Sequence, residues 1–159
     1  MTRFAFAQGA EYAAAVARAV ADDNARAATV LVSGATGDWA WTINGVFAPT
    51  QEKGLDGRVV YGKCGDGSTC IEHYAGYWQV KPVSSKGKDG SFAYVTGGCA
   101  LEACTSRVWG VFNGITWHDQ PSVKAVKGAN AEREVRGGCT THPLPPPPPC
   151  DALRFCAGR

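Results

Sequence analysis

Residues 58–83 read RVVYGKCGDGSTCIEHYAGYWQVKPV and hold three aromatic or β-branched runs separated by short glycine turns. Aromatic and β-branched residues are enriched in strands, whereas glycine, aspartate and serine are enriched in tight turns. The stretch therefore predicts strands at 58–64, 69–74 and 77–83. Strands this close together are typical of an antiparallel barrel or sandwich rather than of βαβ units.

The same pattern of aromatic and β-branched runs separated by glycine turns extends on both sides, from Thr29 to about Val135. The aromatic and β-branched runs predict further strands near 29–33, 39–47, 91–96, 107–113 and 121–127. We therefore expect a mainly β fold, a small antiparallel barrel or sandwich with one N-terminal α-helix and an extended polyproline C-terminal tail. The expected division is 1–28 (leader and helix), 29–135 (β-rich module) and 136–159 (Pro/Cys-rich tail).

Residues 9–28 are rich in alanine and predict the helix. Its apolar stripe consists of Tyr12, Val16, Ala19 and Val20. Asp22 and Asp23 place negative charge near the helix C-terminus, where the dipole disfavours it, so we expect the helix to end near Ala21. Residues 1–8 are interpreted as a frayed leader, with the remnant of a trimmed targeting sequence as the alternative.

The tail contains five consecutive prolines at 145–149. Such a run forms an extended, stiff polyproline II helix, which serves either as a spacer or as a docking strip. Pro145, Pro147 and the nearby Phe155 are candidate partner-binding residues of this arm.

The chain has seven cysteines, of which six form close pairs and Cys139 is left over. Close pairs around glycine-rich loops predict disulfides, and disulfides indicate an oxidising compartment or organelle lumen. The expected location is therefore either the plastid or thylakoid lumen, or outside the cell after secretion. The candidates are Cys64 with Cys70, Cys99 with Cys104, and Cys150 with Cys156.

The net charge is +2, from 16 basic and 14 acidic residues spread along the chain. This argues against a nucleic-acid partner, which needs basic residues gathered on one face. The densest basic group, Lys81, Lys86 and Lys88, is interpreted as a solvated turn. No apolar stretch approaches the ~20 residues of a transmembrane helix, so we expect a chain that does not itself span a membrane, with a peripheral position on a membrane complex left open.

Residues 30–40 resemble the strand-and-glycine loop of dinucleotide-binding enzymes. That motif needs a helix directly after the loop, so that the helix N-terminus faces the pyrophosphate. Here the loop runs into an aromatic segment that reads as a strand, so we expect neither a nucleotide nor any other cofactor.

Cys64, Cys70 and His73 are considered as metal ligands, but the spacing is wide for zinc and a fourth ligand is missing. A hairpin disulfide is the simpler interpretation, with His73 as an ordinary strand residue. His118 and His142 stand in no recognisable catalytic context. We therefore expect no metal site and no catalytic residues.

Trp78 and Trp109 occupy the same pattern, Trp-x-Val, in two expected strands, and their default role is in the core. Trp39 and Trp41 lie two residues apart in an expected strand, so they share one face. Either both are buried, which we favour, or both form an exposed binding patch.

The order of landmarks resembles an uncharacterised module of roughly 100 residues, rich in glycine and tryptophan, in predicted proteins of algae and other protists. Phe47 stands where that module usually has tyrosine. The module implies a photosynthetic or related protist and no defined reaction. The landmarks are Ser33-Gly34-Ala35-x-Gly37, Ile43-Asn44-Gly45-Val46-Phe47, Val60-Tyr61-x-Lys63, Trp78-x-Val80, Ala93-Tyr94 and Trp109-x-Val111.

These observations predict a non-enzymatic accessory or scaffolding subunit with a protein partner, for example in an algal organellar membrane complex such as a photosystem–antenna supercomplex. The alternatives are a secreted or luminal lectin-like module with a glycan ligand, which would show two exposed tryptophans side by side, and a hydrolase of unfamiliar type. The partner-binding candidates outside the tail are Tyr12, Val16, Trp39 and Trp41.

Overall fold

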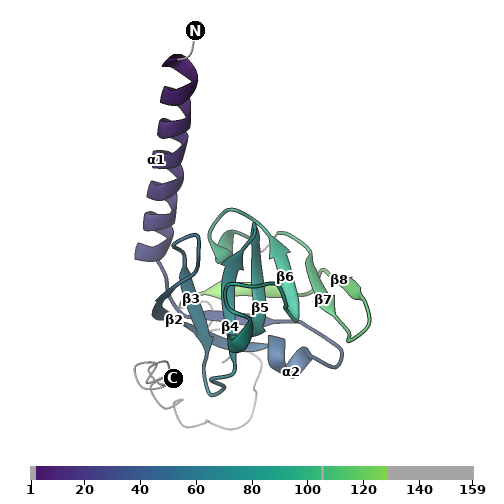
Figure 1. Ribbon diagram of the computed structural model, residues 1–159. Coiled ribbons are helices and arrows are strands. Elements are labelled where there is room, and N and C mark those ends of the chain that lie inside the picture. The colour runs from purple at the N-terminus through teal and green to yellow at the C-terminus, as the bar shows by residue number, and fades with distance from the viewer. Residues whose placement is uncertain (1–2, 105, 129–159) are drawn as a thin grey trace.

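The computed structural model describes residues 3–104 and 106–128, and it confirms a mainly β fold with one long N-terminal helix (Figure 1). Nine antiparallel strands form a single sheet that curls into a half-barrel. The strands are β1 (Val30–Ser33), β2 (Gly45–Lys53), β3 (Val59–Lys63), β4 (Thr69–Tyr74), β5 (Tyr77–Pro82), β6 (Ala93–Thr96), β7 (Trp109–Phe112), β8 (Trp117–Gln120) and β9 (Lys124–Lys127).

The strand order explains why the sheet curls. It runs β8-β7-β6-β5-β4-β3-β2-β1-β9, so β8 and β9 are its two edges. Only residues 121–123 link these edges along the chain, and so short a link spans at most roughly 14 Å. The edges must therefore lie close together. Gln120 of β8 also contacts the loop that follows β1, since its side chain accepts a hydrogen bond from the Thr36 amide (2.9 Å) and donates one to the Thr36 carbonyl (3.1 Å).

The core lies on the inner face of the curled sheet. Alternate residues of each strand point inward, and the register places Ile71 opposite Val80 and His73 opposite Trp78. Trp78 and Trp109 are both fully or almost fully buried, which confirms the core role expected from their repeated pattern. Two 3-10 turns complete the fold, η1 (Val83–Ser85) and η2 (Leu101–Cys104).

The long helix α1 spans Arg3–Ala25, so the predicted bounds of 9–28 and the predicted end near Ala21 are wrong. It begins earlier because the segment that we expected to be a leader contains no glycine or proline and includes the good helix formers Ala5, Ala7 and Gln8. It continues past Ala21 because Asp23 forms an ion pair at 2.8 Å with Arg58, the residue just before β3. This pair offsets the unfavourable interaction of the Asp23 charge with the helix dipole.

The segment expected to be a strand at 39–47 is instead split. Residues Ala40–Ile43 form one helical turn, α2, and the strand β2 begins only at Gly45. Asn44 explains the change, since its side chain accepts from the Ala35 amide (2.9 Å) and donates to the Ala35 carbonyl (2.8 Å), closing the loop between them. The turn is followed by an antiparallel strand rather than the parallel strand of a dinucleotide fold.

Strand β8 was not predicted, because the polar sequence Trp117-His-Asp-Gln120 lacks the apolar alternation of a half-buried strand. It forms an exposed edge through pairing with β7. The expected strands at 29–33, 58–64, 69–74, 77–83, 91–96, 107–113 and 121–127 are otherwise present within a few residues of the predicted bounds.

Candidate functional site

A shallow, open and mostly apolar groove of about 280 Å³ lies between α2 and the segment that follows β5. Its aromatic lining consists of Trp39, Trp41 and Phe92, and Pro82 and Val83 add further apolar surface. The rings of Trp39 and Phe92 stack at a centroid distance of 4.7 Å with an interplanar angle of 30°. Thr42, Ser68, Thr69 and Ser84 complete the lining.

The α2 wall is held by Lys63 at the end of β3. Its Nζ donates to the carbonyl oxygens of Trp41 (2.5 Å) and Thr42 (2.9 Å), the free carbonyls of the helical turn. The ammonium also lies 6.0 Å from the centre of the Trp41 ring. Burial lowers the pKa of Lys63, an effect that the nearby Asp66 carboxylate opposes. The wall is therefore positioned before any ligand arrives.

The opposite wall depends on a buried ion pair. Lys81 is completely shielded from solvent, and its Nζ lies 3.0 Å from Glu72 and donates to the Lys88 carbonyl at 2.7 Å. Glu72 accepts the Gly87 amide at 2.9 Å, and the ammonium lies 4.8 Å from the centre of the Tyr74 ring. The pair thus ties the loop 83–90 to the outer face of the sheet.

This pair corrects the interpretation of the lysine group as a solvated turn. Lys88 is exposed, but Lys81 is buried, and Lys86 forms an ion pair with Glu52. The prediction is wrong for Lys81 because the loop 83–90 folds back over its strand, which local sequence does not reveal. The sequence feature that could have indicated burial of Lys81 is its position between Val80 and Pro82 in a central strand.

The rim next to β4 is shaped by Asp66. Its carboxylate accepts hydrogen bonds from the Ser68 hydroxyl (2.6 Å), the Ser68 amide (3.0 Å) and the Thr69 hydroxyl (2.9 Å). These bonds, those of Ser68 first, lower the pKa of Asp66. The hydroxyl protons of Ser68 and Thr69 are therefore used within the turn rather than presented to the groove.

Trp39 and Trp41 do not share a face, so the prediction that both are buried or both exposed is wrong. Trp39 is half-buried against Phe92, whereas Trp41 is 71% exposed. The reason is α2, because residues two apart on a helical turn point about 200° apart, whereas on a strand they point the same way. The Nε1 of Trp39 is shielded and has no hydrogen-bond partner among the described residues.

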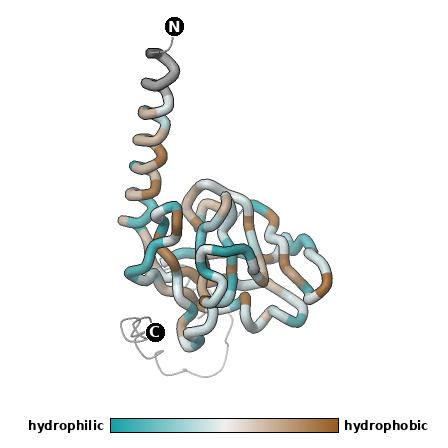
Figure 2. The backbone as a smooth tube through the Cα atoms, viewed as in Figure 1, coloured by the Kyte–Doolittle hydropathy of each residue, from teal (hydrophilic) through white to brown (hydrophobic). Residues whose placement is uncertain are grey.

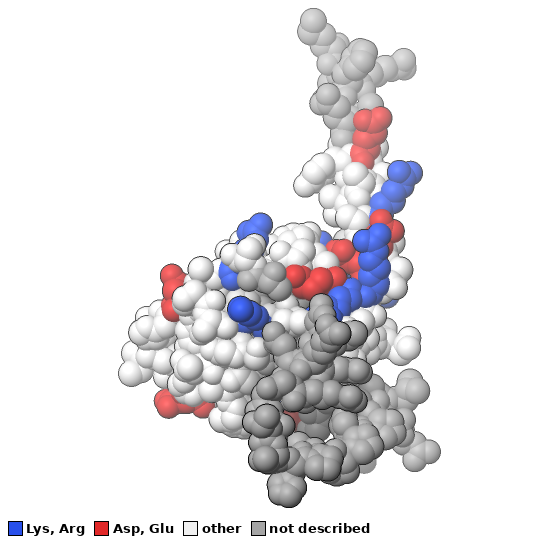
Figure 3. Space-filling view, turned by 180° about the vertical axis from the view of Figure 1, so that it is seen from behind, with Lys and Arg blue, Asp and Glu red and all other residues white. Residues whose placement is uncertain are grey.

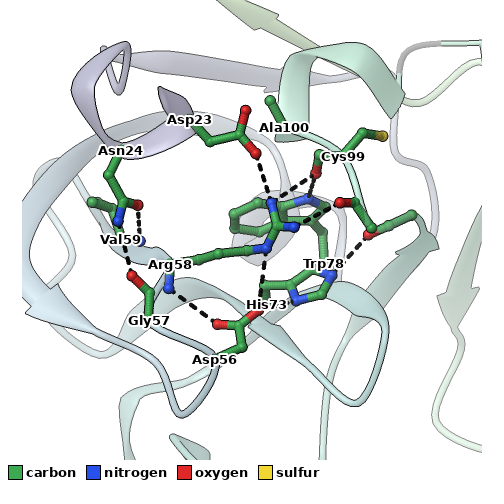
Figure 4. Close-up of polar contacts among 12 residues, drawn as sticks. Asp23, Asn24, Asp56, Gly57, Arg58, Val59, His73, Trp78, Cys99 and Ala100 are labelled. Atoms are coloured by element: carbon green, nitrogen blue, oxygen red, sulfur yellow. Dashed lines mark hydrogen bonds and ion pairs between the residues drawn. The ribbon is translucent and has the colours of Figure 1, made fainter. Parts of the chain in front are cut away.

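The base of α1 is fixed by a second polar cluster, centred on Arg58 (Figure 4). The Arg58 guanidinium is buried, donates to Asp23 at 2.8 Å, and donates to the carbonyl oxygens of Gly98 (2.6 Å) and Cys99 (3.3 Å). Beside it, Asn24 donates to the Gly57 carbonyl and accepts from the Val59 amide, both at 2.9 Å. These contacts join the last turn of α1 to the strand β3 and to the turn after β6.

His73 lies in the same cluster and is a buried strand residue, as expected. Its Nδ1 is 2.5 Å from Asp56 and its Nε2 is 2.7 Å from the Gly97 carbonyl. Both neighbours are acceptors, so only the doubly protonated ring donates to both. The two nitrogens are engaged within the fold. His118 lies on β8 and contacts Asn113 at 2.8 Å.

Above this base, α1 stands clear of the body (Figure 1), and residues 9–19 are exposed on every side. Tyr12 is 74% exposed and Val16 is 43% exposed. Figure 2 shows the apolar positions of this helix on a segment that no described strand covers. Both predicted residues of the N-terminal arm are therefore available for contact.

Figure 3 shows acidic and basic side chains intermixed on one face of the molecule, including the lower part of α1. Of the helices in the described part of the chain, none is both long and apolar enough to cross a membrane. Within 3–104 and 106–128, no three His, Cys, Asp or Glu side chains gather in a way that would hold a metal ion.

The predicted disulfides of Cys64 with Cys70 and of Cys99 with Cys104 stay predictions. Cys99 precedes η2 and Cys104 is its last residue; both are free thiols, and their Sγ atoms lie 3.3 Å apart. Cys70 is a buried free thiol, so a bond to Cys64 stays a prediction. Residues Cys139, Cys150, Cys156, His142, Pro145, Pro147 and Phe155 lie outside the described residues.

A second exposed aromatic cluster lies on the outer face of β5 to β8. Tyr94 contacts Tyr77 at 5.5 Å and Trp117 at 4.8 Å between ring centres, and Trp117 contacts Phe112 at 5.2 Å. We call these four residues the aromatic row. Trp117 and Trp41 are both exposed, but their contacts place them in different clusters rather than side by side.

Sequence reasoning found the tryptophans of the groove but missed Pro82, Val83 and Phe92, which reach it from other elements. It also missed Arg58, whose role depends on α1 returning to β3. No protein-family model, curated protein or solved structure matches the chain.

Proposed function

We propose that this chain is a non-enzymatic binding and scaffolding module that attaches to a partner protein through α1. The observation that carries the proposal is a 23-residue helix that the described part of the chain anchors at its base, while residues 9–19 are exposed. A helix of this length is about 35 Å long. Isolated helices are marginally stable in water, and most helices in proteins owe their stability to packing of an apolar face.

The partner that fits this helix is one that presents a helix of its own. Tyr12, Val16 and Val20 form a narrow stripe at spacings of four residues, and the positions around them are mostly alanine. Small residues beside a narrow apolar stripe allow a second helix to approach closely. The resemblance to a module of algae and other protists makes an organellar membrane complex, such as a photosystem–antenna supercomplex, the first place to look.

The test replaces Tyr12→Glu and Val16→Glu together in the full chain and compares co-purification of the native partner, identified by mass spectrometry. Burying one such side chain contributes about 1.5–3 kcal/mol, so we expect the double variant to weaken association at least about tenfold. The matched control is Ala14→Glu with Ala21→Glu, which adds the same charge to the opposite side of α1.

Equal loss in both double variants would mean that added charge, not the apolar stripe, causes the effect. Retention of the partner by the Tyr12/Val16 variant would contradict the proposal. Self-association of the purified chain, lost in the same variant, would replace the partner by a second copy and would also contradict it.

The aromatic row favours a second candidate, a lectin-like or apolar-ligand-binding module, although it holds one exposed tryptophan rather than the expected two side by side. Aromatic faces at a surface stack on sugars and other apolar ligands, and exposed aromatic patches mark binding sites more often than scattered residues do. Trp117 is 42% exposed and Tyr77 is 39% exposed. A glycan array on the full chain, repeated with Trp117→Ala, tests it, and absence of binding by the unsubstituted chain would remove this candidate.

A further inference from the structure

We propose that the groove between α2 and the segment after β5 binds the chain's own polyproline segment, residues 145–149, within one molecule. The groove has the character that polyproline II ligands require. Such segments dock on shallow surfaces lined by aromatic rings, where proline rings fit between aromatic planes. Here the stacked pair of Trp39 and Phe92 supplies one aromatic surface and the exposed Trp41 a second, and Pro82 and Val83 add apolar lining.

The groove is also positioned in advance. Lys63 holds the α2 wall through two carbonyl oxygens, and the Glu72–Lys81 pair holds the loop of the other wall. A polyproline II segment is likewise ordered before it binds, because proline fixes its own φ angle. Neither side loses much conformational entropy on contact, which favours binding.

The lining favours a proline-rich segment over a sugar. A sugar needs many directed hydrogen bonds, but the protons of Ser68 and Thr69 point to Asp66, and the Lys63 ammonium is engaged with backbone carbonyls. A proline-rich segment needs mainly apolar contact and a few donors for its carbonyl oxygens. Trp41 is 71% exposed, so its indole N–H is open to such a carbonyl.

The chain length places the segment within reach. Strand β9 ends at Lys127, which pairs with Val30, and residues 128–144 join it to the first of the five prolines. A link of about 17 residues spans roughly 55–60 Å when extended and about 23 Å as a flexible coil. A β body of about 100 residues is roughly 35 Å across. A tethered segment therefore reaches the groove at an effective concentration in the millimolar range.

The experiment uses the full-length chain labelled with 15N and follows the indole N–H signals of Trp39 and Trp41. In a variant with prolines 145–149 replaced by serine, we expect both signals to shift relative to the unsubstituted chain. A synthetic peptide covering residues 141–151 with serine in place of Cys150, added to this variant up to about 1 mM, should return both signals toward their original positions. Trp41→Ala in the proline-free variant should weaken peptide binding about tenfold or more, as expected for an aromatic anchor.

The matched control is Trp117→Ala, an exposed tryptophan of the aromatic row, which should leave peptide binding unchanged. Identical indole signals with and without the prolines would overturn the proposal, as would a peptide with no effect. Shifts that grow with protein concentration would assign the contact to two copies and overturn the intramolecular form. Sugars that shift these signals when the peptide does not would make the groove a glycan site instead.

Discussion

Gly34 shows how a residue that suggests a nucleotide loop serves the fold. Its φ is +87°, and a Cβ built there would lie 2.1 Å from the Ser122 carbonyl oxygen, which belongs to the link between β8 and β9. The Ser122 hydroxyl also donates to the Gly34 carbonyl at 3.0 Å. The glycine is required where two chain segments 88 residues apart touch at the closure of the half-barrel.

We expect Gly34→Ala to lower the free energy of unfolding by about 3 kcal/mol or more, through backbone strain and the clash with Ser122. Gly37→Ala is the control. Gly37 has a similar φ of +94° but open space around it, so it should lose only about 1 kcal/mol. Urea denaturation of both variants measures the difference in the free energy of unfolding. Equal losses would show that the contact of a Cβ at position 34 with Ser122 does not contribute to it.

The buried pair of Glu72 and Lys81 is the other residue-level feature with a testable consequence. Removing one partner leaves an uncompensated buried charge, so Lys81→Met should cost about 3–5 kcal/mol in urea denaturation. The double variant Glu72→Gln with Lys81→Met removes both charges and should recover most of that loss. Lys124→Met, at an exposed position of β9, is the control and should change stability by less than about 0.5 kcal/mol. A double variant no better than Lys81→Met would contradict the pairing.

At the scale of elements, α1 depends on its base. The helix has no acidic residue in its first turn and no basic residue in its last turn, so its own ends contribute little through the dipole. Asp23 and Asn24 instead connect it to β3 by side-chain contacts across about 35 positions of sequence. The direction in which the arm points is therefore set by the body.

Asn24→Ala removes two hydrogen bonds to the body and leaves the Gly57 carbonyl and the Val59 amide without these partners. We expect a loss of about 1–3 kcal/mol and faster amide hydrogen exchange in the last turn of α1. Asp22→Ala, at the exposed neighbouring position, is the control. Unchanged exchange in Asn24→Ala would mean that Arg58 and Asp23 alone hold the helix.

At the scale of the whole molecule, two buried thiols and a buried phenol make the free energy of unfolding fall at alkaline pH. Burial raises the pKa of Cys70 from 9.0 to about 11, that of Tyr61 from 10.0 to about 12, and that of Cys104 from 9.0 to about 12. The folded state therefore binds these protons more tightly than the unfolded chain. Their contribution is fully present below about pH 9 and is lost as pH rises through the folded values.

We expect the urea midpoint, measured with a reductant present, to be level from about pH 7 to 8.5 and to fall steadily between about pH 9 and 11. Cys70→Ala removes one of the three groups, so its midpoint should fall less over the same range, although the variant starts lower because of the cavity. Equal pH dependence in the two proteins would show that Cys70 is not a contributor.

The sequence by itself determined the features that depend on local pattern. Aromatic and β-branched runs between glycine turns specify most of the strands, and the Trp-x-Val repeats correctly mark Trp78 and Trp109 as core. Alanine content specifies a long N-terminal helix. Propensity and periodicity act within a few residues, so each of these features can be predicted from the sequence of its own segment.

Only the tertiary structure decided the rest, because each remaining feature needs a partner that is distant along the chain. Asn44 turns the Trp39–Trp41 segment into α2 by reaching back to Ala35, Arg58 extends α1 by pairing with Asp23, and the groove exists only where α2 meets the segment after β5. Long-range contacts carry no periodic signal in sequence, and their energies outweigh local propensity once the sheet has curled.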